Sequence, residues 1–124
     1  MKKSICAAAL TAFLLALFSC SAKKTQTLSV AVFVPGIIAD SPIYAMLAEG
    51  VQHAVASYND GKHTSAQASV TVLEAGTNQA EWSAKLTALA AEQKYSVIIS
   101  SNPSLPELVE PLTVQFPNQK FILL

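Results

Sequence analysis

The sequence contains no arginine, because all eight of its basic residues are lysines. Nucleic-acid binding needs a concentrated basic surface, which this composition does not provide. Without guanidinium groups the chain also lacks the bidentate clamp with which arginine holds carboxylates and phosphates. We therefore expect no nucleic-acid partner, and a ligand that is not held by such a clamp.

Cysteine and catalytic motifs are equally scarce. Only Cys6 and Cys20 occur, and Cys6 lies in a segment that export would remove, so no intramolecular disulfide is expected. The chain lacks CxxC, HExxH, GxSxG, GxGxxG and the phosphate-binding loop. Neither His53 nor His63 has a cysteine or a second histidine at metal-ligand spacing. These absences predict a protein that is not an enzyme and holds no metal or cofactor.

The first residues resemble an export signal. A basic start, Met1–Lys3, precedes an apolar run over residues 5–18 that is too short to span a membrane, so residues 1–19 are predicted to be a signal peptide. Residues 17–20 (Leu-Phe-Ser-Cys) resemble a bacterial lipobox, in which the cysteine becomes the lipidated first residue, although Phe18 is bulkier than usual. The alternative is an ordinary cysteine after a plain secretory signal.

If Cys20 carries lipid, the protein is exported and anchored to the bacterial cell membrane by its N-terminus. Residues 20–27 are polar and are predicted to form a tether between the membrane and the domain. Everything from residue 28 onward is expected to be folded.

The stretch over residues 28–58 predicts a strand, a loop and a helix. Residues 28–34 are an apolar, valine-rich run that suits a central strand buried on both faces, and Pro35-Gly36 ends it. Ser41 is placed to cap the helix and Pro42 suits its first position. The residues that recur at helical spacing, and are expected to face inward, are Ile43, Leu47, Val51, Ala54, Val55 and Tyr58.

The same alternation continues to the end of the sequence. Further strands are predicted over 68–75, 95–100 and 120–124. One helix follows Asn78, with Glu81 placed as in a capping box and Trp82 in the core, and another covers 105–115, where Pro111 would bend or split it. The class is therefore α/β, a partial three-layer, doubly wound parallel sheet.

The predicted last strand leaves an apolar sheet edge with nothing after it to cover it. We therefore expect residues 28–124 to be the front part of a longer protein that has been truncated. A complete minimal domain is the alternative.

Small polar groups gather where the predicted strands end. They are Asp40, Ser41, Tyr44, Thr77, Asn78, Ser100, Ser101 and Asn102. The carboxyl ends of parallel strands share one edge of the sheet, where ligands of open α/β folds bind. Convergent hydroxyls, amides and a carboxylate suit an uncharged polar solute. Capping alone accounts for Ser41 and Asn78, so Asp40 and Asn102 are the stronger candidates.

Three segments carry a resemblance to a known family: VAVFVPGIIADSPIYAMLAEGVQHAV, LAAEQKYSVIIS and LVEPLTVQFPNQKFILL. They are similar to the basic membrane protein family, the nucleoside-type solute-binding lipoproteins of ABC importers. The resemblance covers nearly all of the predicted mature chain. It implies that residues 28–124 are the N-terminal lobe of a type I periplasmic binding protein whose second lobe is absent. It also implies an ABC transporter permease as partner and no enzymatic activity.

The resemblance also implies ligand-binding positions at Asp40, Ile43, Tyr44, Ser101 and Asn102. The family usually has a Phe-Asn pair after the aspartate, where this chain has Ile43 and Tyr44, so a nucleoside is one candidate among similar uncharged polar solutes. The alternatives are a small membrane-anchored structural or interaction lipoprotein and a non-functional truncated gene product. A flavodoxin-like enzyme is disfavoured by the missing phosphate loop.

Overall fold

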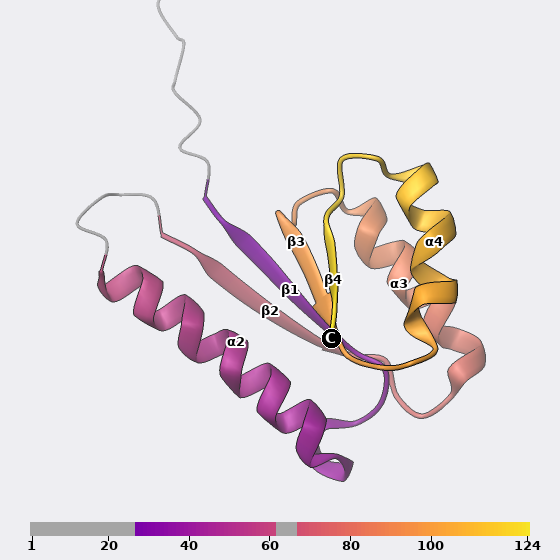
Figure 1. Cartoon of the computed structure of the whole chain (residues 1–124), viewed down its shortest axis with the longest axis horizontal. Coiled ribbons are helices and arrows are strands. Elements are labelled where there is room, and N and C mark those ends of the chain that lie inside the picture. Colours follow the sequence, from indigo (N-terminus) through magenta and orange to yellow (C-terminus); the bar gives the residue numbers. More distant parts are fainter. Residues whose placement is uncertain (1–26, 62–66) are drawn as a thin grey trace, which may run out of the picture.

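The structure, a computed structural model, describes residues 27–61 and 67–124. The predicted signal peptide, Cys20, most of the tether and His63 lie outside the described residues. The elements alternate along the chain as strand and helix (Figure 1). In order they are β1 (Ser29–Val34), η2 (Ile38–Asp40), α2 (Pro42–Asp60), β2 (Ser69–Glu74), η3 (Gln79–Glu81), α3 (Trp82–Ala91), β3 (Val97–Ser100), α4 (Leu105–Gln115) and β4 (Phe121–Leu123).

Within the described residues the strands form one parallel sheet of four, in the order β2-β1-β3-β4. Val32 of β1 is in register with Val72 of β2 and with Ile99 of β3. The chain winds outward from β1 to β2 and then crosses to β3 and β4 on the other side, so the strand order reverses between β1 and β3. This confirms the predicted doubly wound parallel sheet.

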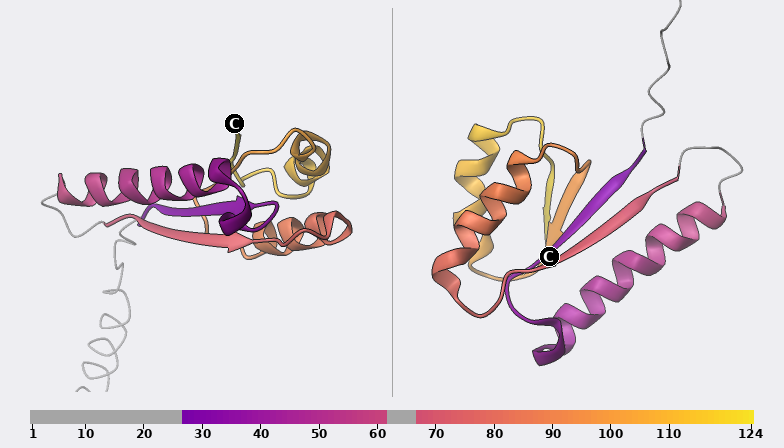
Figure 2. Two further views of the ribbon diagram at one scale, coloured as in Figure 1. Left: turned by 90° about the horizontal axis from the view of Figure 1, so that it is seen from below. Right: turned by 180° about the vertical axis from the view of Figure 1, so that it is seen from behind.

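Helices cover the two faces of this sheet. Helix α2 lies on one face and packs on β1 and β2, whereas α3 lies on the opposite face (Figure 2). Strand β1 is covered on both sides: Val32 and Val34 on the α2 side and Phe33 on the other side are all completely buried. The predicted central, doubly covered strand is confirmed over residues 29–34, whereas Leu28 precedes the strand and is 38% exposed.

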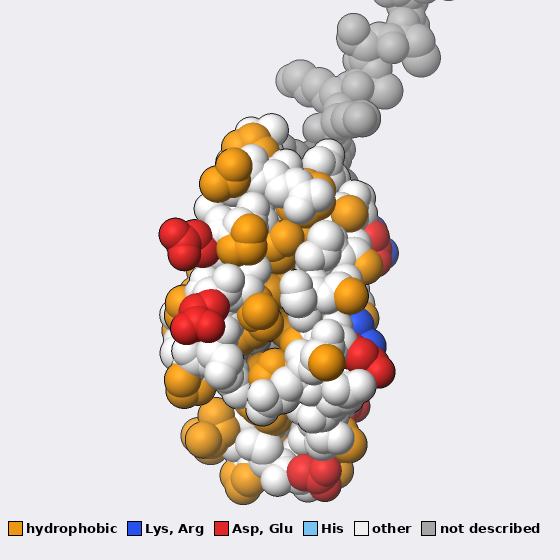
Figure 3. All heavy atoms as spheres, turned by 90° about the vertical axis from the view of Figure 1, so that its right-hand side faces the viewer, with side chains coloured by type: hydrophobic (Ala, Val, Ile, Leu, Met, Phe, Trp, Pro, Cys, Tyr) orange, Lys and Arg blue, Asp and Glu red, His pale blue; other side chains and the backbone are white. Residues whose placement is uncertain are grey.

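The larger core lies between the sheet and the pair α3 and α4. It is built on Phe33 and Ile98 of the sheet, Leu86 of α3 and Leu105 of α4, each at most 1% exposed. Trp82 belongs to this cluster, as predicted. From the side of these two helices, hydrophobic side chains form a band with charged side chains along its margins (Figure 3). Helix α4 runs uninterrupted through Pro111, so the predicted split does not occur.

Helix α2 is less buried than its sequence predicts. Ala48 is its only fully buried residue, and Ile43 is 65% exposed. Ala54 and Tyr58 are also exposed, so the expectation that these three residues face inward is wrong. The reason is that α2 packs mainly on β1, β2 and the adjoining η2 turn, which cover only one side of the helix. Its first turn begins at Pro42, as predicted, but the Ser41 side chain makes no capping hydrogen bond.

Candidate functional site

The loops that follow the strands meet at one edge of the sheet, where the chain ends at Leu124 (Figure 1). Backbone hydrogen bonds join them pairwise: the Gly76 N–H donates to the Gly36 carbonyl at 3.0 Å, and the Leu124 N–H donates to the Ser100 carbonyl at 3.0 Å. The loops that carry the predicted polar groups therefore converge at this edge. In a parallel sheet, the loops that follow the strands all lie at this same edge.

Tyr44, in the first turn of α2, connects the first loop to the third. The Tyr44 hydroxyl donates to the Pro35 carbonyl at 3.1 Å and accepts a hydrogen bond from Asn102 Nδ2 at 3.1 Å. Its ring lies against the backbone of Gly36, where a Cβ atom would stand 2.6 Å from Tyr44 Cε2. A residue without a side chain is therefore needed at position 36 for the ring to occupy this place.

A glutamate holds the same loop from the other side. Glu74, the last residue of β2, accepts a hydrogen bond from the Ile38 backbone N–H through Oε2 at 2.7 Å. Ile38 begins the short η2 turn, and Asp40 ends it. The Asp40 side chain is exposed and makes no hydrogen bond or ion pair with the described residues. Its carboxylate is therefore available to a ligand.

The third loop is tied into the sheet by its hydroxyl groups. Ser100, only 2% exposed, donates from Oγ to the Phe33 carbonyl of the neighbouring strand. Ser101 donates from Oγ to the Leu124 carbonyl at 3.0 Å. Asn102 uses both ends of its amide, because Oδ1 accepts from the Ser104 N–H at 2.9 Å while Nδ2 bonds Tyr44. Ser101 and Asn102 are half-buried at the edge of the site.

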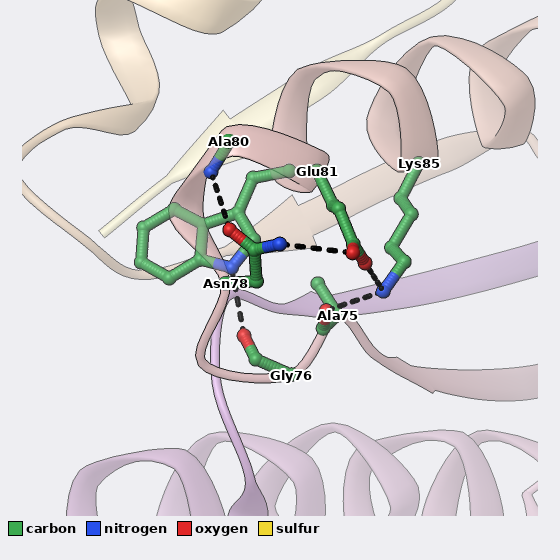
Figure 4. A network of polar contacts seen from close by, with 7 residues as sticks. Ala75, Gly76, Asn78, Ala80, Glu81 and Lys85 are labelled. Atoms are coloured by element: carbon green, nitrogen blue, oxygen red, sulfur yellow. Dashed lines mark hydrogen bonds and ion pairs between the residues drawn. The ribbon is translucent and has the colours of Figure 1, made fainter.

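The second loop is closed by a network at the start of α3 (Figure 4). Asn78 accepts from the Ala80 N–H, as expected of a cap, but its amide donates to the Glu81 carboxylate at 2.9 Å in place of the reciprocal backbone bond of a capping box. Lys85 Nζ contacts Glu81 Oε2 at 2.7 Å and donates to the Ala75 carbonyl at 2.8 Å. The Lys85 and Asn78 bonds lower the pKa of Glu81 below its ordinary value.

Trp82 completes this network. Its Nε1–H donates to the Gly76 carbonyl at 2.7 Å, and the side chain is 5% exposed. Gly76 has a φ of 76°, a conformation that residues with a Cβ rarely adopt. The polar groups of Asn78 and Trp82 therefore bond atoms of the protein itself, and these bonds hold the second loop in place beside the site.

The five predicted ligand positions thus fall into two groups. Asp40 and Ile43 are exposed, whereas Tyr44, Ser101 and Asn102 are half-buried and bonded to other loop atoms. Sequence reasoning assigned no role in this site to Glu74 and no packing role to Gly36. The signal for Glu74 was its position at the end of a strand, but only the folded chain shows that its partner is the Ile38 N–H, 36 residues away.

The described residues hold no cluster of three or more histidine, cysteine, aspartate or glutamate side chains that would suit a metal ion. Among these same residues, no helix has the length and apolar character needed to cross a membrane. The sheet edge presents the exposed carboxylates of Asp40 and Glu74, of which Glu74 bonds the Ile38 N–H, together with the exposed aliphatic side chain of Ile43 and a border of hydroxyl and amide groups. Such a surface can accept hydrogen bonds from a polar solute and contact its apolar face.

A comparison with protein families identifies this region. The model of the family Bmp, described as "ABC transporter substrate-binding protein PnrA-like", matches residues 27–124. The match includes every strand, every helix and all the loops of the candidate site described above.

Proposed function

From the premise that the chain belongs to the Bmp family of PnrA-like ABC transporter substrate-binding proteins, we propose that its sheet edge forms one wall of a site for an uncharged polar solute of the nucleoside type. The family is one of extracytoplasmic substrate-binding proteins. In this proposal the chain presents the solute to the membrane permease of an importer.

The observation that carries the proposal is the position of Asp40. Its carboxylate is exposed and lacks a partner among the described residues, on a loop that is fixed by Glu74 and Tyr44. A carboxylate in this setting accepts hydrogen bonds from paired hydroxyl groups, such as those of a sugar. Ile43, the second residue of α2 and 65% exposed, supplies an apolar surface three residues after Asp40. Ser101 and Asn102 line the opposite side of the wall.

A second lobe is part of the same proposal, and the coverage of the sheet supports it. Val30 and Val32, which lie under α2, are at most 5% exposed, whereas Ile122 of β4, which lies on the same face through its register with Ile99 of β3, is 46% exposed. Parallel sheets are ordinarily covered on both faces. We therefore assign this half of the face to a further segment of the same polypeptide, and the solute to the cleft between two lobes.

Membrane anchoring through lipid at Cys20 is the third part of the proposal. It rests on the lipobox-like residues 17–20 and the polar residues that follow. Metabolic labelling with a palmitate analogue tests it: the Cys20→Ser protein should lose the label and its membrane association, and a labelled Cys20→Ser protein would contradict the assignment.

The proposed function is tested by isothermal titration of the full gene product with a panel of nucleosides and free sugars. At least one should bind, and Asp40→Asn should weaken binding by on the order of tenfold to a hundredfold, the usual range for a hydrogen bond to a charged group. Asp60→Asn, which changes an exposed aspartate at the far end of α2, is the matched control and should leave the affinity unchanged. Equal affinities for the two variants would contradict the role of Asp40.

A further inference from the structure

We propose that Tyr44 is a positioning residue: with Asn102 it ties the first loop to the third and fixes Asp40 in the wall of the site. This inference deepens the proposed function and rests on it. The tie is a chain of two hydrogen bonds, from Asn102 Nδ2 to the Tyr44 hydroxyl and from that hydroxyl to the Pro35 carbonyl, each 3.1 Å long. It joins residues 58 positions apart in the sequence.

The hydroxyl of Tyr44 is used as donor and as acceptor at once. A phenolic group has one proton to donate, and here that proton goes to Pro35. The ring is fixed as well, because it fills the place of the missing Cβ of Gly36. Tyr44 is therefore held by contacts within the protein. A solute could contact only the part of its side chain that these contacts do not cover.

The loop that Tyr44 holds needs such a tie. Ser41 does not cap α2 with its side chain, so the junction between η2 and α2 lacks the bond that usually fixes a helix start. Glu74 accepts a hydrogen bond from the loop at Ile38, on the β2 side, and Tyr44 donates one to the loop at Pro35, on the β3 side. Asp40 lies in the sequence between Ile38 and the helix that carries Tyr44.

A wall fixed in this way lowers the cost of binding. A loop that is already ordered does not lose conformational freedom when the solute arrives, so less of the interaction energy is spent on ordering it. The effect of Tyr44 on a ligand is then indirect. It appears in the free protein as slow amide exchange of residues 35–41, before any solute is present.

Hydrogen–deuterium exchange of the free full chain tests this inference. Tyr44→Phe keeps the ring and removes both hydrogen bonds, and should speed exchange over residues 35–41 by about tenfold, the factor that corresponds to about 1.4 kcal/mol. The strands and α3 should keep their protection. Tyr95→Phe removes a phenolic hydroxyl at the opposite edge of the sheet, from a side chain that is 7% exposed, and should leave residues 35–41 unchanged.

A second pair of variants guards against a general loss of stability. Asn102→Ala should speed exchange of the same loop, and the double variant should match Tyr44→Phe alone, because both changes break one tie. Unchanged exchange over residues 35–41 in Tyr44→Phe would overturn the inference, as would faster exchange spread evenly over the whole domain. These readouts need no ligand, so failure of the inference is distinct from a failure of every solute to bind.

Discussion

Tyr44 and Gly36 are in such close contact that a methyl group on Gly36 would stand 2.6 Å from the ring atom Cε2. Replacing Gly36 with alanine should therefore push the ring out of its place and break its bonds to Pro35 and Asn102. We expect Gly36→Ala to lower the free energy of unfolding by about 1–3 kcal/mol, the range for overpacking a well-filled site. Urea unfolding followed by circular dichroism measures this loss.

Gly50 is the matched control for that substitution. It lies inside α2, and a Cβ atom there would meet nothing within 4 Å. Because glycine is a poor helix former, Gly50→Ala should raise the free energy of unfolding by about 0.5–1 kcal/mol. The same sign of change for both glycine variants would contradict the packing described for Tyr44.

Asn59 joins the end of α2 to the start of β2. Its Nδ2 donates to the Ala68 carbonyl at 3.0 Å, and its Oδ1 accepts from the Ala68 N–H at 2.7 Å. Asn59→Ala leaves both backbone groups without this partner and should cost about 1–3 kcal/mol. Thermal unfolding checks this, with Asn118→Ala, an exposed turn residue, as the control that should change little.

Trp82 is both a core side chain and a hydrogen-bond donor. Trp82→Phe removes the bond to the Gly76 carbonyl and leaves space in a site that is 5% exposed, so we expect a loss of about 2–4 kcal/mol. The measurement should use circular dichroism, since the chain has a single tryptophan and the variant loses the fluorescence signal. Val114→Ala, at a side chain 81% exposed, should stay within about 0.5 kcal/mol of the parent.

The pair Glu81 and Lys85 predicts a dependence of stability on pH. The folded state lowers the pKa of Glu81 below its ordinary value of 4.5, chiefly through the hydrogen bond from Lys85. A lowered carboxyl pKa stabilises the fold above the unfolded-state pKa, and this contribution is lost as the pH falls through the folded-state pKa. The parent should therefore exceed Glu81→Gln in stability at neutral pH.

Chemical denaturation at a series of pH values follows this difference. It should shrink as the pH falls below about 4.5 and vanish once the carboxyl is protonated in both states. Glu110→Gln in α4 is the control, since Glu110 makes no ion pair with the described residues. A gap between parent and Glu81→Gln that is constant with pH would contradict the Lys85 bond as its cause.

The strands and α4 could be predicted because their signals are local. An apolar run such as residues 28–34 specifies a buried strand by itself, and α4 was predicted with the bounds that the structure gives it. The inward face of α2 could not be predicted, because the helical spacing of Ile43 and Tyr58 does not reveal how much of the sheet lies beneath them.

The site was predictable in position and only partly in role. Parallel strands bring the loops that follow them to one edge, so the loops that carry Asp40 and Asn102 were expected to lie close together. The hydrogen-bond partners of Tyr44 and Glu74 could not be predicted. Tyr44 bonds the amide of Asn102 and Glu74 bonds the backbone N–H of Ile38, and both partners are distant in the sequence. Such long-range pairs depend on the register of the sheet, which no single segment specifies.

Native mass spectrometry of the full gene product, recovered from cells after export, shows whether the protein carries a solute at Asp40. We predict a bound, uncharged polar small molecule that is released on denaturation, and much less of it on Asp40→Asn than on Asp60→Asn. A correctly folded, exported protein that carries no solute and takes up none from a nucleoside mixture would contradict a solute site at Asp40.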